Sequence, residues 1–155
     1  PNSLTTHVLQ TGFTVEDDTH KVSFKTPPSE NVEIVASVFI NRTSTSDVGL
    51  YAALSEDNAT DGYTVLGSNA KYEYGGAASY GSDDEIDDEI VTYRWVVQAA
   101  ELASIGSNND IWIAFKSTDS PGATLTYGYS TSPDRAYTAF TIKATALPST
   151  IYDGT

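Results

Sequence analysis

The stretch Val32-Glu33-Ile34-Val35-Ala36-Ser37-Val38-Phe39-Ile40 decides the fold class of this chain. Apolar residues occupy its even positions, and most of its residues are β-branched or aromatic, which is typical of a strand with one buried face. The same alternation recurs in 90–97, 111–115 and 140–144. These runs predict an all-β domain whose core lies between antiparallel strands.

Working outward from these runs, the sequence predicts further strands separated by turn residues such as Asp61-Gly62, Gly75-Gly76 and Ser120-Pro121-Gly122. Short strands at this spacing favour an antiparallel β-sandwich, jelly-roll-like in type. We predict one such domain over 1–146 and an extended C-terminal tail over 147–155. The expected strands are 7–13, 21–25, 32–40, 49–54, 64–66, 70–74, 89–98, 111–117, 123–129 and 137–146.

The strand at 89–98 is partly apolar on both of its faces, which predicts a central position in a sheet. In the following strand, alternation places Ile111, Ile113 and Phe115 on the inner face and Trp112 on the opposite one. The segment 99–103 between these strands has a helical composition but is too short to be stable alone. We expect a turn-like crossover whose Leu102 closes one end of the core.

Composition excludes several classes of function. The net charge is −13, from 21 acidic and 8 basic residues, which argues against binding to nucleic acid or to an anionic membrane surface. No apolar run reaches the roughly 20 residues that a membrane-spanning helix needs. The chain has no cysteine, so it has neither disulfides nor thiolate metal sites.

Carboxylates are densest in Asp83-Asp84-Glu85-Ile86-Asp87-Asp88-Glu89. Carboxylate loops capture calcium, so Asp83, Asp84, Glu85, Asp87 and Asp88 are candidate ligands and calcium is the one cofactor to consider. The favoured interpretation is a solvated, self-repelling loop without a cofactor. The segment 57–62 resembles a calcium loop but has Ala59 at the third ligand position, which predicts a tight turn instead.

The sequence gives little support for catalysis. His7 and His20 lie in or beside the first strands, and the chain contains neither a Gly-x-Ser-x-Gly nucleophile motif nor a His-Glu-x-x-His zinc motif. Acidic residues are plentiful, but no pattern marks a pair of them for glycoside hydrolysis. We therefore expect a protein that is not an enzyme.

Tyrosines form the most interesting group of aromatic residues. Tyr72, Tyr74 and Tyr80 flank the small-residue segment 75–79. Tyrosine has an apolar ring and a polar tip, which suits recognition surfaces and stacking against sugar rings. These three residues are equally consistent with a contact surface and with ordinary packing of a loop.

Several segments together resemble a β-sandwich domain of virion structural proteins from marine tailed phages, particularly fibre-like and capsid-decorating proteins. The segments are 22–34, 50–55 with 57–60, 93–97, 111–116 and 140–148. The resemblance implies a non-enzymatic protein at the virion surface that is commonly homo-oligomeric, contacts other virion proteins, and acts in assembly, stabilisation or host attachment. It assigns no individual functional residues.

Two functions therefore remain in competition. The first is a virion structural protein, as capsid decoration, fibre or adhesin, which could also contact a glycan on the host surface. The alternative is a carbohydrate-binding β-sandwich module of a secreted bacterial protein, with calcium as a possible aid. Oligomeric state and glycan binding distinguish the two.

Overall fold

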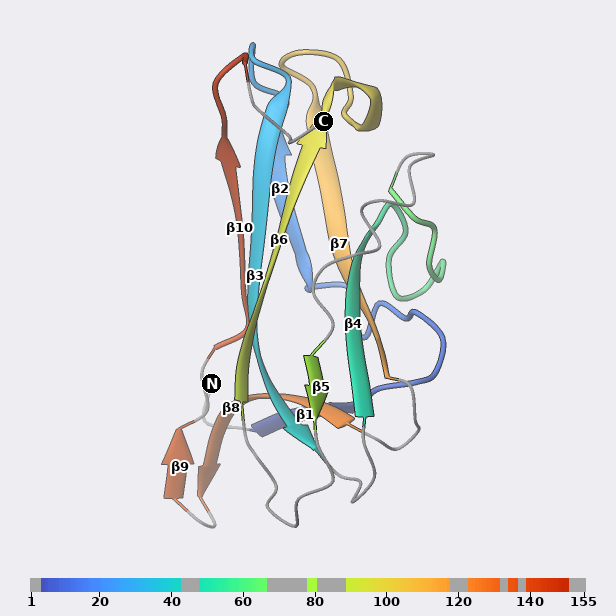
Figure 1. Cartoon of the computed structure of the whole chain (residues 1–155), viewed down its shortest axis with the longest axis vertical. Coiled ribbons are helices and arrows are strands. Elements are labelled where there is room, and N and C mark those ends of the chain that lie inside the picture. Colours follow the sequence, from blue (N-terminus) through green and yellow to red (C-terminus); the bar gives the residue numbers. More distant parts are fainter. Residues whose placement is uncertain are drawn as a thin grey trace.

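A computed structural model of the chain describes residues 4–42, 48–66, 78–80, 89–117, 123–131, 134–136 and 139–150 (Figure 1). The regular secondary structure of this part is almost entirely β-strand, arranged as antiparallel sheets packed against each other, which confirms the predicted β-sandwich. Its elements are β1 (Leu4–Val8), β2 (Lys21–Lys25), β3 (Asn31–Arg42), β4 (Val48–Ser55), β5 (Ala78–Tyr80), β6 (Glu89–Gln98), the 3-10 helix η2 (Ala99–Glu101), β7 (Asn108–Ser117), β8 (Ala123–Thr131), β9 (Asp134–Ala136) and β10 (Thr141–Ala146).

The first eight strands pair as one long hairpin that is wound into two sheets. β1 pairs with β8, β2 with β7, β3 with β6 and β4 with β5, all antiparallel, so that each pair is nested inside the previous one. Contacts of β3 with β8 and of β4 with β7 then join neighbouring pairs sideways. This nested arrangement of eight strands in two sheets is a jelly roll, as the sequence predicted. β9 extends β8, and β10 pairs with β3.

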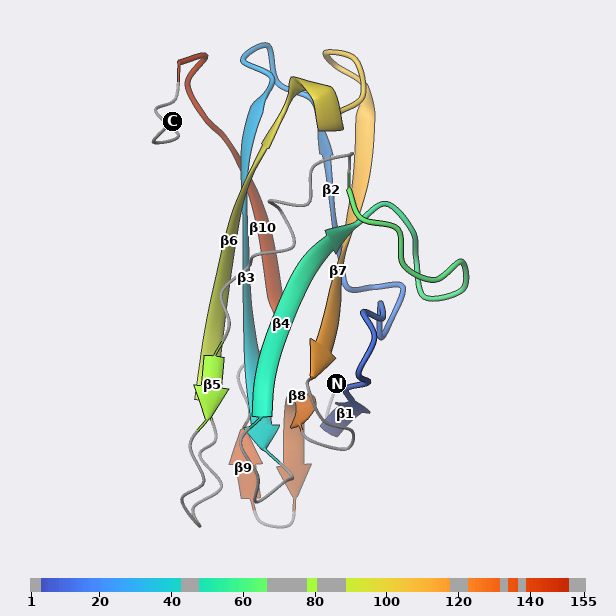
Figure 2. The ribbon, with the colours of Figure 1, turned by 45° about the vertical axis from the view of Figure 1, so that its right-hand side comes forward.

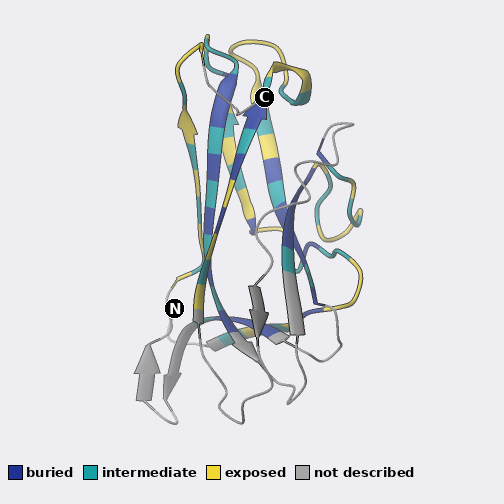
Figure 3. Cartoon of the chain, in the orientation of Figure 1, coloured by how far each residue is buried: buried dark blue, intermediate teal, exposed yellow. Residues whose placement is uncertain are grey.

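The two sheets face each other (Figures 1 and 2). One apolar core lies between them. β3 is the central strand of its sheet because it pairs with β6 along one side and with β10 and then β8 along the other. Its even-numbered residues from Val32 to Ile40 point inward and are at most 2% exposed, as the alternation predicted. Burial follows a similar alternation along β7 (Figure 3), except that the outward-facing Ala114 is buried as well. The largest core side chains come from both sheets: Tyr93, Phe115, Leu9, Ile34, Ile40, Leu54, Ile111, Ile113 and Leu125.

The predicted central position of 89–98 is wrong, because β6 pairs with β3 alone among the described strands. Only one face is buried, and its residues include Tyr93, Trp95 and Val97. Its outward apolar residues made the strand look buried on both faces, but Ile90 is 53% exposed and lies opposite Phe39. Their hydrophobicity reflects packing across strands on the solvent side rather than burial in a sheet interior.

Most expected strands lie within a few residues of the observed ones, and 21–25 and 89–98 coincide with them. The first strand is Leu4–Val8 rather than 7–13, and 137–146 is confirmed only from Thr141 onward. The short strand β5 was not predicted, the expected 64–66 is reduced to a bridge at Val65, and 70–74 lies outside the described residues. Leu102 packs against the core after η2, as expected.

The start of the predicted tail is held against its own domain. The backbone N–H of Leu147 donates to the carbonyl oxygen of Asn31, 2.9 Å away. The side-chain amide of Asn31 donates in turn to the carbonyl oxygens of Pro148 and Ser149 at 3.0 and 3.2 Å. Asn31 is itself buried, so these bonds satisfy a polar group inside the fold and fix where the chain leaves β10.

Candidate functional site

The residues singled out in the sequence fall largely outside the described parts of the chain. Tyr80 is the last residue of β5, where only the backbone is described, whereas Tyr72 and Tyr74 lie outside the described residues. The acidic candidates Asp83, Asp84, Glu85, Asp87 and Asp88 also lie outside them. In the part of the chain that is described, no group of three or more His, Asp or Glu side chains is placed to hold a metal ion.

The segment 57–62 forms the tight turn that the sequence predicted. The side-chain oxygen of Asn58 accepts hydrogen bonds from the backbone N–H groups of Thr60 and Asp61, both at 2.9 Å. The N–H of Gly62 closes the turn onto the carbonyl oxygen of Asn58 at 2.9 Å, and Gly62 has a φ of 107°, which only glycine adopts readily. The Asn58 side chain is therefore used by the turn itself.

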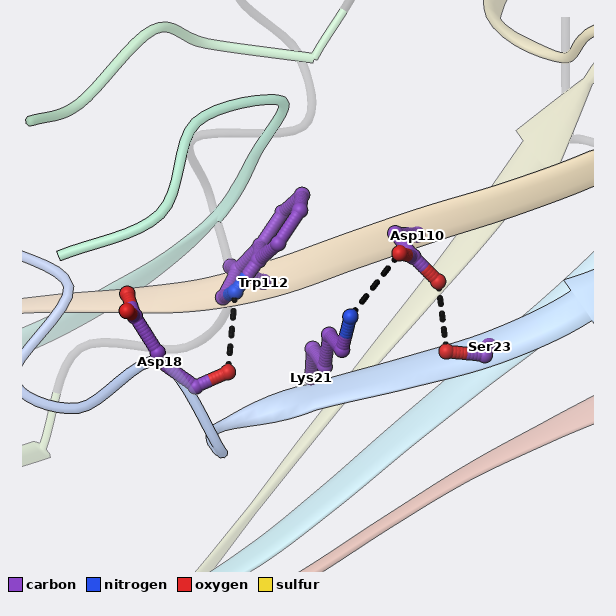
Figure 4. Close-up of polar contacts among 5 residues, drawn as sticks. All are labelled: Asp18, Lys21, Ser23, Asp110 and Trp112. Atoms are coloured by element: carbon purple, nitrogen blue, oxygen red, sulfur yellow. Dashed lines mark hydrogen bonds and ion pairs between the residues drawn. The ribbon is translucent and has the colours of Figure 1, made fainter. Parts of the chain in front are cut away.

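A polar and aromatic block lies on the outer face of the sheet β2-β7-β4-β5 (Figure 4). Register places Lys21 of β2 beside Trp112 of β7, and Ser23 beside Asp110. Because residues two apart on a strand share a face, these four side chains form a two-by-two arrangement, the Trp112 block. Trp112 is half-buried, whereas the side chains of Lys21 and Asp110 are 35% and 43% exposed.

Hydrogen bonds hold the Trp112 block in one geometry. Lys21 Nζ donates to Asp110 Oδ2 at 2.8 Å, and Ser23 Oγ donates to Asp110 Oδ1 at 2.5 Å. These two bonds lower the pKa of Asp110, which keeps its carboxylate charged. Lys21 Nζ also lies 5.0 Å from the centre of the Trp112 ring, within the range of a cation–π contact. The block therefore combines an aromatic ring with an ordered ion pair.

Two loops frame the indole of Trp112. Its Nε1 donates to the carbonyl oxygen of Asp18 at 3.1 Å, which fixes the orientation of the ring (Figure 4). The Asp18 carboxylate accepts the backbone N–H of Ala59 at 2.7 Å, which ties the loop before β2 to the turn after β4. On the β4 side, Ser55 is paired with Trp112 and is fully buried. The ring is thus oriented by backbone rather than by flexible side chains.

Further along the same face, aromatic rings pack around a lysine instead of standing apart. Lys116 Nζ lies 4.3 Å from the ring centre of Phe13 and 5.1 Å from that of Tyr51. Phe13 stacks on Tyr63 with ring centres 5.0 Å apart. This second cluster covers the sheet, because Ala114, which also faces outward, is fully buried.

A second polar cluster lies inside the sandwich, at the join between the β1–β8 pair and the β2–β7 pair. His20, which immediately precedes β2, is 1% exposed, and its Nε2 lies 3.1 Å from the hydroxyl of Tyr127 in β8. His7 of β1 places its Nε2 3.4 Å from the same hydroxyl. The His20 ring also packs on Phe140 with ring centres 4.4 Å apart. These residues, the His–Tyr cluster, link four segments of the fold.

Burial determines the charge of this cluster. It lowers the pKa of His20 to about 4, helped by the neighbouring His7 and opposed by Asp17. Burial also lowers the pKa of His7, against the attraction of Asp17. His20 is consequently neutral at pH 7, and its Nδ1 is buried without a hydrogen-bond partner among the described residues. Protonation would place a charge beside a tyrosine hydroxyl and aromatic rings, and the attraction of Asp17 offsets this cost only in part.

Trp112, His7 and His20 stood out in the sequence, but their partners in the two clusters did not. The alternation in 111–115 already placed Trp112 on the outer face, and an outward tryptophan two residues after Asp110 was the available signal. The pairing of Lys21 with Trp112 depends on register, which the sequence did not give. His7 and His20 belong to no sequence motif. They come together only because β1 and β2 wind around the core, which the sequence pattern does not reveal.

Comparison with known proteins adds no relative to this picture. No protein-family model, no curated protein and no solved structure matches the chain. Among the described residues, no helix is both long and apolar enough to cross a membrane.

Proposed function

We propose that this chain is a non-enzymatic structural protein of a phage virion, acting in capsid decoration, as part of a fibre, or in host attachment. The observation that carries the proposal is the jelly roll of nested strand pairs, a fold used by viral capsid proteins as well as by lectins. Fold alone does not determine function. Further support comes from the resemblance of the strand and turn segments and from the high acidity of the chain, which keeps densely displayed copies from associating non-specifically.

The outer face of the β1-β8-β3-β6 sheet offers a contact surface for another copy or another virion protein. Val8 of β1 is 44% exposed and Ile90 of β6 is 53% exposed, and both point away from the core on this face. Phe39 of β3 lies directly opposite Ile90 on the same face. Val8 lies two strands away from the Phe39–Ile90 pair, and exposed apolar surface of this kind is typical of interaction sites.

The proposal is tested by the oligomeric state of the isolated chain and by its binding to purified capsids or tails. Light scattering coupled to size-exclusion chromatography should show a stable oligomer. Its fraction should rise with salt, because −13 charges on each copy oppose association at low ionic strength. A strict monomer at all salt concentrations that also binds no virion component would contradict the proposal.

A matched pair of variants locates the contact. Ile90→Lys places a charge on the outer sheet face, whereas Ile105→Lys does so in the turn before β7, at a residue of similar exposure, 56%. We expect Ile90→Lys to lower the oligomer fraction and Ile105→Lys to leave it unchanged. Equal effects of the two variants would show that this face is not the contact.

The second candidate function is carbohydrate binding, as a module of a secreted protein or as the receptor-binding part of a virion adhesin. The specific observation in its favour is the ordered Trp112 block on an exposed sheet face. A glycan array, read with and without calcium, tests this candidate. An array without any binding under both conditions would remove it.

A further inference from the structure

We propose that the Trp112 block, formed by Lys21, Ser23, Asp110 and Trp112, is the binding site for a neutral saccharide ring. This inference rests on the second candidate function and gives it a location, a ligand class and a set of roles. It also assigns the expected contact surface to β2 and β7 instead of to the tyrosines near 72–80 that the sequence suggested.

The indole of Trp112 is positioned on the outside of the sandwich. Trp112 lies on the outer face of β7, outside the apolar core, which takes Ile111 and Ile113 from the same strand. An indole offers a large apolar face against which the C–H groups of a pyranose ring can pack. Because Nε1 is held by the Asp18 carbonyl oxygen, little side-chain freedom is lost when a ligand binds.

Lys21 and Asp110, beside the ring, keep hydrogen-bonding capacity that the block does not use. Each oxygen of Asp110 accepts one bond within the block and retains a further lone pair, and the ammonium of Lys21 has three donors of which one is used for Asp110. The exposed fractions of 35% and 43% leave both groups accessible to a ligand. A fixed acceptor next to a fixed donor matches the adjacent hydroxyls of a sugar, each of which both donates and accepts.

Charge selects the class of saccharide. The Lys21 ammonium and the Asp110 carboxylate neutralise each other, so the block offers no net positive charge to a carboxylate or sulfate on a ligand. The chain as a whole carries −13 and repels anionic glycans at long range. Both observations favour neutral hexoses over uronic, sialic or sulfated sugars.

The roles predict separate effects for each residue. Trp112→Ala removes the stacking face and should weaken binding at least about tenfold, as is typical for a central aromatic anchor. Trp112→Phe keeps a smaller ring and should restore part of the affinity. Asp110→Asn keeps the size of the side chain but removes its charge and half of its acceptor capacity, and should weaken binding by a smaller factor.

The experiment uses the full chain against an array of neutral and acidic glycans, followed by titration of the strongest neutral ligand by calorimetry and by tryptophan fluorescence. The chain has two tryptophans, and Trp95 is 4% exposed in the core. A ligand-dependent change in emission should therefore disappear in Trp112→Phe while calorimetry still detects residual binding. Arg94→Ala, on the outer face of the other sheet, is the control and should bind as the unaltered chain does.

The outcomes separate this inference from the function on which it rests. Neutral-glycan binding that is unchanged by Trp112→Ala but lost in a Tyr72, Tyr74 and Tyr80 triple alanine variant would overturn the site and leave carbohydrate binding intact. Selective binding of acidic glycans would overturn the ligand class. An array without hits would overturn both the site and the second candidate function, while the proposal of a virion structural protein would still stand on oligomerisation.

Discussion

The His–Tyr cluster and the Trp112 block are built from similar parts but lie in opposite environments. Each combines rings with a short network of hydrogen bonds, one between the sheets and the other on the outer face of β7. In the buried cluster, the pKa of His20 falls to about 4 because its charged form cannot be hydrated. In the exposed block, hydrogen bonds from Lys21 and Ser23 lower the pKa of Asp110. Burial converts a polar network into a determinant of stability, and exposure leaves it available for ligands.

The two faces of β7 show the same contrast between a buried and a more exposed ring. The largest effect that we expect on stability comes from changing the buried one. Phe115 and Trp112 lie on opposite faces of β7, Phe115 fully buried against Tyr93 and Phe140 and Trp112 half-buried outside. We expect Phe115→Ala to lower the free energy of unfolding by about 3–5 kcal/mol through loss of burial and creation of a cavity. Trp112→Ala should lower it by about 1–2 kcal/mol, since less apolar surface and one hydrogen bond are lost.

Urea denaturation followed by circular dichroism measures both variants on one scale. If Phe115→Ala prevents folding, Phe115→Leu serves instead and should still cost more than Trp112→Ala. Equal costs for Trp112→Ala and the Phe115 variant would mean that the outer ring is a structural element, and the comparison between the two faces would fail.

The next effect concerns pH. Unfolded His20 binds a proton below about pH 6.5, whereas folded His20 binds one only near pH 4, so between these values the unfolded state holds more protons and stability rises with pH. Acidification from pH 6.5 to 4 should therefore remove roughly 3 kcal/mol through this residue. His7, Asp17 and Tyr127 are the neighbouring groups that modulate the loss.

The contribution of His20 is isolated by comparison with His20→Phe, because the two proteins share all their carboxylates and only Asp17, whose pKa His20 helps to lower, loses a charged neighbour. The difference in unfolding free energy between pH 7 and pH 4.5 should be smaller in His20→Phe than in the unaltered chain. Proton NMR of the imidazole C–H groups gives the pKa directly, even if the variant does not fold. A His20 that titrates near pH 6.5 in the folded protein would show that the ring is hydrated.

A smaller effect is expected from the hydroxyl that joins the two histidines. Tyr127→Phe removes a group that lies 3.1 Å from His20 Nε2 and 3.4 Å from His7 Nε2, and leaves a buried ring nitrogen without that partner. We expect a loss of about 1–2 kcal/mol at pH 7 in thermal or urea unfolding. Tyr51→Phe, on the outer face of the other sheet, is the control. A Tyr127→Phe protein as stable as this control would mean that the hydroxyl contributes nothing to the cluster.

Sequence reasoning reached the faces of strands but not the encounters between them. Alternation identified the inward residues of β3 and β7 because it depends only on neighbours along the chain. It was misled at β6, where outward Ile90 and Val96 resemble the second face of a central strand. The Tyr127 hydroxyl, by contrast, contacts His20 and His7, which are separated from it by 107 and 120 positions in the chain. These contacts result from the winding of the strands into two sheets, which local sequence patterns do not contain.

The smallest effect on stability should come from the ion pair of Lys21 and Asp110. Both side chains are more than one-third exposed, so water and salt screen their attraction, and a double-mutant cycle with Lys21→Met and Asp110→Asn should give a coupling of at most about 1 kcal/mol that falls with added salt. Urea denaturation of the four proteins measures it. A coupling above this range and insensitive to salt would place the pair with the His–Tyr cluster as a stabilising network. A small, screened coupling, together with a clear loss of saccharide affinity in Asp110→Asn, would show that this ordered pair on an exposed face is maintained for binding rather than for folding.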